Sequence, residues 1–418
     1  MMRRMAFRHL WVAIVGSLAC AALGGCATTT KDPCDPSKGV CYPITLAADP
    51  GGRWIVAVGA NFDRQFAAGA ARLVDTATNR YVPGASAAVP GFAGVAALLP
   101  PGDPSAPSAP WRALVTARDD DSLTVLDIDP VKATLTCGPL EADGRCNSAW
   151  RIAGSDLLGA DPLGLAVARG PAGQWFAHVA ATTDGTVGVF AVAPAAAGNP
   201  LAFKKIDSIS YGSGLTGIAT ASGSGRAYVS DARAPRIHAY RVDATGNPAS
   251  PWRVVRETGI DVPAGGARDY GRGIRMAGQG SHLYVAWRSP AAVAVIDIAP
   301  GRNGVPRHTV AAMVPVGGQP ADIAVAPTGP AGRDLVYASS FGDDSVWIVD
   351  PALRQVVGVV RLPHAPYAVV VVRVPSAAHP AGRWTLYAAL FNHHDLVAVP
   401  LQEGVRDATT PIATVAAP

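Results

Sequence analysis

The sequence predicts an all-β protein that repeats one unit of four short strands seven times. Apolar and polar residues alternate over many short stretches, which is typical of strands with one buried face. Gly and Pro account for 45 and 36 of the 418 residues and interrupt these stretches at short intervals, as turn residues do. No long stretch has the periodicity of an amphipathic helix. The chain therefore consists of strands and turns.

The sixth unit shows the pattern most clearly. Its stretch YASSFGDDSVWIVDPALRQVVGVV runs from Tyr337 to Val360. Apolar residues alternate, stop at Phe341–Asp344, alternate again, stop at Asp350–Pro351, and alternate a third time. A lead-in strand that ends in a Gly-rich turn, PADIAVAPTGPAG from Pro320, precedes this stretch. One unit is therefore a meander of four antiparallel strands, which cannot bury its faces alone.

Six further stretches have the same pattern and set the repeat length. They are WIVAVGANFD from Trp54 with RLVDTATNRYV from Arg72, ALVTARDDDSLTVLDI from Ala113, FAHVAATTDGTVGVFAV from Phe176, AYVSDARAPRIHAYRV from Ala227, LYVAWRSPAAVAVIDI from Leu283 and LYAALFNHHDLVAVPL from Leu386. We take the following residues as equivalent: Val56, Val115, Val179, Val229, Val285, Tyr337 and Tyr387. The units thus recur about every 50 to 60 residues.

A closed ring is the arrangement that suits seven such sheets. Each four-stranded sheet then buries both faces against its neighbours, and no long edge stays open. Small Ala, Gly and Val residues dominate the first strand of each unit, where sheets crowd together in a ring. A β-sandwich array gives no sevenfold repeat, and an open solenoid needs polar caps that the sequence lacks. We therefore predict a seven-bladed β-propeller of four-stranded antiparallel blades over residues 42–418.

The sixth unit resembles the YVTN-type β-propeller repeat. That repeat has a Pro-x-Gly-Ile-Ala strand, a Tyr-Val-Thr-Asn strand, a Gly-Asp turn and a Val-x-Val-Ile-Asp strand. The residues PADIAVAP, from Pro320, and DLVYASSFGDDSVWIVDPALRQVVGVVRL, from Asp334, carry the resemblance. It extends over almost all of residues 42–418, although Pro400 stands in the seventh unit where Asp is usual. The resemblance implies the propeller fold, and similar propellers include lactone hydrolases and the propeller parts of periplasmic redox enzymes.

The first 25 residues have the composition of an export signal. Arg3, Arg4 and Arg8 form a positive segment, and the apolar run LWVAIVGSLACAAL, Leu10–Leu23, follows. This run has the length of a signal peptide and is short for a membrane span. We therefore expect residues 1–25 to be a signal peptide.

The end of this signal resembles a bacterial lipobox. Leu23-Gly24-Gly25 precedes Cys26, which would be lipidated and become the mature N-terminus. An ordinary secretory signal with an unrelated Cys is the alternative. Ala27 follows the Cys, and in the family pattern a residue other than Asp there favours the outer membrane. We therefore predict an outer-membrane lipoprotein of the cell envelope, with residues 26–41 as a polar tether.

The charge and the cysteines agree with an exported protein. The formal net charge is +4, and three positive charges lie in the signal, so no nucleic-acid partner is indicated. Two of the six Cys, Cys20 and Cys26, belong to the signal region. Export favours disulfides for the other four, and local pairing is the simplest of three alternatives. Zinc is the rival, but neither pair has Cys-x-x-Cys spacing. The expected bridges are Cys34–Cys41 and Cys137–Cys146.

Catalytic motifs are missing from the sequence. It has no Cys-x-x-Cys-His, no Gly-x-Ser-x-Gly and no His-Glu-x-x-His. The segment FNHHDL, with His393, His394 and Asp395, is the sharpest local candidate for metal binding. It occupies the middle turn of the seventh unit, where neighbouring side chains point in different directions, so we interpret it as a solvated turn. We therefore expect no metal and no cofactor.

The candidate binding residues lie in the loops that lead into the innermost strands. In a propeller these loops surround the axis, and such concave mouths commonly bind ligands. The longest of them, Thr258–Gly273, contains four candidates, and three other loops contain one each. The candidates are Arg268, Asp269, Tyr270, Arg272, Gln319, His364 and Tyr211. Arg, Tyr and His suit the recognition of carboxylate or sugar groups, whereas a pair between Arg268 and Asp269 would only pin the loop.

These observations favour a binding scaffold over an enzyme. We predict a membrane-anchored, monomeric, non-catalytic propeller for a protein, peptide or glycan partner. The alternative is a hydrolase of lactonase type, or a subunit of a periplasmic redox enzyme, with its site at the axial mouth. A purely structural envelope component is the third interpretation. The fold alone does not decide among them.

Overall fold

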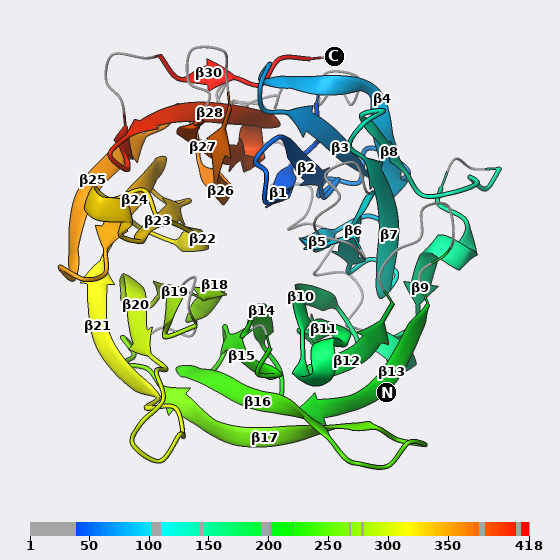
Figure 1. Cartoon of the computed structure of the whole chain (residues 1–418). Helices are drawn as coiled ribbons and strands as arrows, with labels where there is room; N and C mark the ends of the chain where they lie inside the picture. Colours follow the sequence, from blue (N-terminus) through cyan, green and yellow to red (C-terminus); the bar gives the residue numbers. More distant parts are fainter. Residues whose placement is uncertain are drawn as a thin grey trace, which may run out of the picture. The chain divides into compact units, whose positions relative to one another are not determined.

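The computed structural model describes residues 39–101, 110–142, 145–193, 200, 202–221, 223–266, 269–276, 280–375, 381–406 and 411–417. Within these residues, seven antiparallel sheets are arranged in a ring (Figure 1). The predicted seven-bladed propeller is therefore confirmed. Cys26, Cys34 and Arg268 lie outside the described residues, so the interpretations of these three residues stay predictions. No described helix is long and apolar enough to cross a membrane.

Each sheet is a meander in which consecutive strands pair. Blades one to four contain β1 (Pro43–Ala48), β2 (Trp54–Gly59), β3 (Gly69–Asp75) and β4 (Arg80–Val89); β5 (Ala93–Leu99), β6 (Trp111–Ala117), β7 (Ser122–Asp129), β8 (Thr134–Thr136) and β9 (Arg151–Ala153); β10 (Pro162–Arg169), β11 (Trp175–Ala181), β12 (Thr186–Val192) and β13 (Phe203–Ser210); and β14 (Leu215–Thr220), β15 (Arg226–Asp231), β16 (Arg236–Ala244) and β17 (Trp252–Asp261).

Blades five to seven continue the same order. They contain β18 (Gly271–Met276), β19 (His282–Arg288), β20 (Ala291–Asp297) and β21 (Thr309–Pro315); β22 (Pro320–Ala326), β23 (Leu335–Ser340), β24 (Ser345–Asp350) and β25 (Gln355–Arg361); and β26 (Pro366–Val374), β27 (Arg383–Leu390), β28 (Asp395–Gln402), β29 (Val405–Arg406) and β30 (Ala413–Thr414). The described helical segments are short: η1 (Ser148–Trp150), α2 (Ser155–Leu158), η2 (Pro171–Gly173), η3 (Pro330–Gly332) and η4 (Phe391–His393).

The hydrophobic core lies largely between neighbouring blades. One cluster joins Tyr284 and Val293 of blade five to Ile323 and Val349 of blade six. Both faces of each blade pack against a neighbour, so strands such as β2 and β23 are buried along their whole length and not only at alternate residues.

Every innermost strand carries a β-bulge near its start. In blade four, for example, Leu215 pairs with Asp231 and Ile218 pairs with Val229, so Thr216 and Gly217 together oppose Ser230. The other six innermost strands have a register shift at the same place. A bulge bends its strand and re-aims its side chains, so each blade presents at least one bulge residue toward the axis.

Three glycines occupy the second bulge position, where adjacent blades approach most closely. A Cβ on Gly164 would lie 2.2 Å from the carbonyl oxygen of Thr216, which belongs to the next blade. A Cβ on Gly217 would lie 2.8 Å from the oxygen of Arg272, and one on Gly273 would lie 2.7 Å from the Cα of Asp322. Blades three, four and five therefore need Gly at this position.

Hydroxyl side chains join the bulges of alternate blades. The Ser230 hydroxyl accepts from the N–H of Gly217 in its own blade, at 2.9 Å, and donates to the oxygen of Arg272 in the next, at 2.6 Å. Thr116 and Ser339 make the same two bonds in blades two and six. The equivalent residues of the other blades are Val58, Ala180, Ala286 and Ala389. Blades two, four and six are thus each tied to their successor by a side chain.

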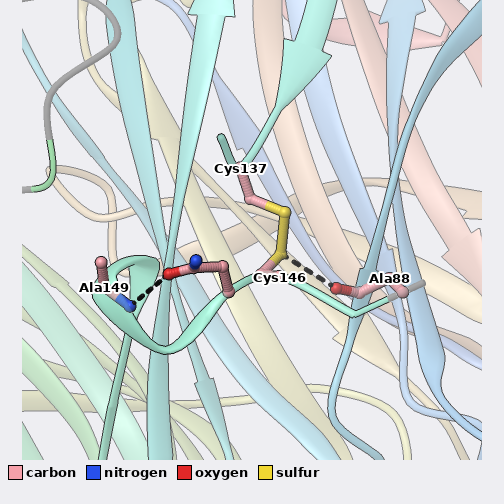
Figure 2. The surroundings of a disulfide bond; sticks show 5 residues. Ala88, Cys137, Cys146 and Ala149 are labelled. Carbon is pink, nitrogen blue, oxygen red and sulfur yellow. Dashed lines mark hydrogen bonds between the residues drawn. A yellow bond between two sulfur atoms is a disulfide. The ribbon is translucent and has the colours of Figure 1, made fainter. Parts of the chain in front are cut away.

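Blade two has a divided outer edge that a disulfide holds. β8 and β9 both pair with β7, and the chain between them contains the Cys137–Cys146 bridge (Figure 2). The predicted disulfide between these two cysteines is confirmed, so neither is available as a zinc ligand. The Sγ of Cys146 lies 3.3 Å from the carbonyl oxygen of Ala88, so this insert lies against blade one. Cys41 is also in a disulfide, but its predicted partner Cys34 lies outside the described residues.

The ring is closed by residues 413–416. β30 supplies an outer strand to blade seven by pairing with β28, and the chain then continues beside β4 of blade one (Figure 1). The N–H of Tyr81 donates to the oxygen of Ala416 at 3.1 Å, and the N–H of Ala416 donates to the oxygen of Asn79 at 2.9 Å. This short segment therefore links the seventh blade to the first.

Candidate functional site

A narrow cavity lies on the axis of the ring. All seven innermost strands line it, mainly through their bulge residues, which are Ile44, Thr45, Gly94, Val95, Leu163, Leu165, Thr216, Gly217, Ile218, Arg272, Gly273, Arg275, Ala321, Asp322 and Tyr367. The centres of water-sized molecules can occupy about 60 Å³ of it. At about 15 Å³ for each water, this volume holds roughly four. The cavity therefore accepts a small chemical group.

Charged residues line the cavity on the side of blades five and six only. Arg275 follows the bulge of β18, and the equivalent residues of the other blades are Ala47, Ala97, Ala166, Ala219, Ala324 and Val370. Asp322 is the second bulge residue of β22, where the other blades have Gly, Ala, Thr or Val. Because half-buried charges lose hydration, the fold alone does not favour them here.

Two groups of paired charges link blade five to blade six. Asp269 accepts from Arg272 at 2.7 Å through Oδ1 and from Arg288 at 2.9 Å through Oδ2. Arg288 also donates to the oxygen of Pro320 at 3.0 Å, which lies in blade six. These contacts fix the Arg272 side chain beside the cavity.

The second group consists of Arg275 and Asp322. Nη2 of Arg275 lies 3.3 Å from Oδ1 of Asp322, and the other carboxylate oxygen accepts from the N–H of Val369 at 3.2 Å. The two side chains are 40% and 17% exposed. Both carboxylate oxygens of Asp322 thus already have partners.

Aromatic rings gather on the face of the ring that we call the mouth face. This face carries the loops that lead into the innermost strands and the turns between the second and third strands of each blade. Six rings form the aromatic cluster: Tyr42, Phe62, Phe92, Phe341, Tyr367 and Phe391. They come from blades six, seven, one and two, which are consecutive in the ring.

Phe391 holds the aromatic cluster together. Its ring centroid lies 5.2 Å from Tyr42, 5.7 Å from Phe62 and 5.6 Å from Tyr367. Phe62 is 52% exposed, and Tyr367 also lines the axial cavity. The aromatic cluster therefore extends from solvent to the edge of the cavity.

The phenol of Tyr42 is fixed within this cluster. Its hydroxyl donates to Oδ2 of Asp63 at 2.8 Å. Burial and this carboxylate raise the pKa of Tyr42 to about 12, so the phenol stays protonated.

Among the described residues, no three of His, Cys, Asp and Glu lie close enough together to hold a metal ion.

The structure places the predicted residues of the longest loop in different surroundings. Arg272 lines the cavity, and Asp269 lies beside it. Tyr270 is only 8% exposed and stacks on Trp287 at 5.5 Å, so it is a core residue and its predicted binding role would need it to move. Asp269 pins the loop through Arg272 and Arg288, whereas a contact with Arg268 is not described.

The other predicted residues do not line the cavity. Gln319 is exposed on the mouth face, where its backbone oxygen accepts from the N–H of Phe341 at 3.2 Å. His364 stacks on His393, so the incoming loop and the middle turn of blade seven meet. Tyr211 stacks on His238 and lies under Arg256, which belong to the outer half of blade four. A role for these three in binding stays a prediction.

The middle turn of blade seven is less solvated than the sequence suggested. His393 and Asp395 are exposed. His394, however, accepts from the N–H of Tyr42 at 3.0 Å through Nδ1, and its ring lies edge-on to that tyrosine. It therefore anchors the aromatic cluster.

The comparisons with known proteins agree with the fold. No protein-family description and no curated protein matches the sequence. Among solved structures, a chain of the hydrazine synthase of Kuenenia stuttgartiensis matches with a TM-score of 0.56 and 16% identity, over 92% of this chain and 100% of that one. The periplasmic gluconolactonase of Pseudomonas aeruginosa matches with a TM-score of 0.53 and 18% identity, over 78% and 86%.

A third similar structure is a complex. Chaetomium thermophilum Sqt1, bound to the N-terminus of ribosomal protein L10, matches with a TM-score of 0.52 and 15% identity, over 88% of this chain and 86% of that one. These three proteins differ in function: a hydrazine synthase, a gluconolactonase and a protein that binds a ribosomal protein segment. At such identities the likeness shows the propeller fold alone.

Proposed function

We propose that this protein is a binding module that takes a protein or peptide partner on its mouth face. The aromatic cluster is the observation that carries the proposal. Interfaces bind mainly through a few aromatic and Arg side chains, and exposed apolar groups of this kind mark interaction sites. Arg64 adds a cation over the ring of Phe92, at 4.8 Å. Binding of a ribosomal protein segment by Sqt1 supports this use of the fold.

The arrangement of the rings favours a polypeptide over a glycan. Neighbouring rings of the aromatic cluster are tilted by 51° to 71° in the contacts around Tyr42 and Phe62. Rings tilted in this way form no flat platform along which sugar rings stack. A protein or peptide segment with apolar anchors is therefore the proposed partner.

A matched pair of variants tests this proposal. Phe62→Ser should reduce capture of the partner from solubilised envelopes at least tenfold, because an interface anchor contributes about 1.4 kcal/mol or more. Leu353→Ser is the control, since Leu353 is 51% exposed but lies in the turn after β24, outside the cluster. Pull-down followed by quantitative mass spectrometry measures the difference. Equal loss in both variants contradicts the proposal, and no specific capture by the wild type favours a purely structural envelope component.

The proposed location is the outer membrane, through a lipid on Cys26. The order of positive segment, apolar run and Leu-Gly-Gly-Cys supports it, as does the disulfide of an oxidising compartment. We also assign the repeat to the YVTN type, on the residues of the sixth unit. Cys26→Ala should release the protein from membranes or stall its processing. Palmitate labelling with fractionation checks this, and a variant that is still labelled contradicts the lipobox.

A hydrolase of lactonase type is the second candidate function. Asp322 supplies the acidic residue that such a site needs, and a gluconolactonase shares the fold. Against it, both oxygens of Asp322 already have partners, so the carboxylate is poorly placed to take a proton. Hydrolysis of gluconolactone above the spontaneous rate, abolished by Asp322→Asn, would support the hydrolase over the binding module.

A further inference from the structure

We propose that the axial cavity binds a carboxylate group on a short apolar stem. This inference rests on the proposed function, because it assigns a ligand chemistry to the same mouth. Two sources present this chemistry: the C-terminus of a bound polypeptide and a free short-chain acid. The cavity, the charges around it and its apolar wall each support the assignment.

The charges at the cavity leave one cation without a carboxylate of its own. Asp269 is shared between Arg272 and Arg288, at 2.7 and 2.9 Å. Arg275 has Asp322. The described part of this group therefore has three guanidinium groups and two carboxylates. Guanidinium groups bind carboxylates in a defined geometry, so an anion with one charge completes the group.

Arg272 has a donor without an acceptor. Its Nε is buried, and no described atom accepts a hydrogen bond from it. A buried donor that lacks a partner costs free energy, and a bound anion that accepts from it would recover this cost. A small movement of the Arg272 side chain toward the cavity would turn this donor to a bound anion.

The opposite wall of the cavity is apolar. Val95, Leu163, Leu165 and Ile218 come from blades two, three and four. A ligand with its carboxylate at blades five and six therefore places a carbon chain against these side chains. The space of about 60 Å³ holds a group of about the size of four waters, which fits propionate.

Propionate is the probe, with propionamide as its neutral match. Calorimetric titration of the wild-type protein should give saturable binding of propionate with a Kd of about 1 to 10 mM, since ligands of five heavy atoms reach such affinities. Propionamide and chloride should bind at least tenfold more weakly. Arg272→Gln should weaken propionate binding about tenfold or more. Arg256→Gln, on β17 outside the cavity, should leave it unchanged.

The same ligands distinguish the two sources. Propionate that blocks capture of the envelope partner, while propionamide does not, identifies a C-terminal carboxylate as the ligand. Propionate that binds without affecting capture identifies a free short-chain acid. Both results support the carboxylate site.

Three results would overturn the inference. These are no saturable binding of propionate up to about 100 mM, equal binding of propionamide or chloride, and unchanged binding in a folded Arg272→Gln protein. Should that variant fail to fold, the wild-type comparison of propionate with propionamide still decides. If the carboxylate site fails these tests, the proposed function still holds, provided that Phe62→Ser loses capture of the partner and Leu353→Ser keeps it.

Discussion

The innermost strands of blades three and four and those of blades five and six share one backbone but differ in side chains. All four carry the same bulge. Two positions after the bulge, blades three and four have Ala166 and Ala219, whereas blade five has Arg275. Within the bulge itself, blades three and four have Gly at the second position, whereas blade six has Asp322. The bulge and the small residues are therefore sufficient for the blades to pack in a ring, and this packing does not require the charged residues.

The largest expected effect on stability comes from placing a side chain at Gly164, where blades three and four approach closely. Gly164→Val should lower the free energy of unfolding by about 3 kcal/mol, because its side chain meets the backbone oxygen of Thr216, which cannot move aside. Gly318→Val is the control, since a Cβ there lies 4.0 Å from the nearest atom, on Gly342. Urea unfolding of both variants measures the difference. Equal stability would mean that the blades are not held as closely as described.

Acid sensitivity should arise in the core of blade three. Burial lowers the pKa of His178 to about 3, and its Nδ1 lies 2.8 Å from the hydroxyl of Tyr240. The unfolded chain binds a proton below its ordinary pKa of 6.5, while the folded chain does not. Stability should therefore fall as the pH drops from 6.5 toward 3, by about 1.4 kcal/mol per pH unit from this group.

His178→Gln tests the assignment, because glutamine keeps a partner for Tyr240 but does not titrate. The pH dependence of the unfolding midpoint should be shallower in this variant by about one proton. Identical slopes in the two proteins would place the acid-sensitive group elsewhere.

The ion pair at the cavity should couple modestly. Arg275→Ala and Asp322→Gly each restore a residue type found in other blades, and each should cost about 1 kcal/mol because the remaining charge loses its partner. The double variant should cost less than the sum, with a coupling of about 0.5 to 1 kcal/mol. A double-mutant cycle by urea unfolding checks this. Strict additivity would show that the pair contributes nothing across the two blades.

The strand pattern predicted the blades but not the registers within them. The residues opposite the bulges in blades one, six and seven are Val58, Ser339 and Ala389, two positions after the predicted Val56, Tyr337 and Tyr387, whereas in the other four blades the offset is one position. A bulge inserts a residue into a strand without changing its apolar alternation, so periodicity does not reveal it. Closely spaced cysteines, by contrast, correctly indicated the Cys137–Cys146 bridge.

The candidate site was predictable only in part. The loop before blade five led to Arg272, which lines the cavity because loops that lead inward must reach the axis, while its role in binding stays a prediction. Tyr270 is buried because Trp287, seventeen positions later, supplies a ring to cover it. An alignment of the seven units would have shown that Arg275 stands where five other blades have Ala and one has Val. The aromatic cluster has no local signal, since its rings lie in separate loops that meet only in the folded ring.

The closing segment also affects the order in which the chain acquires its final shape. Arg80 donates to the oxygen of Ala417, a partner 337 positions away. Each blade is assembled from neighbouring residues and can form early, while this seam joins the most distant ones and must form late. Until then, blade one and blade seven expose unpaired strand edges to other chains. Aggregation through these edges is therefore most expected in the interval before residues 413–416 dock.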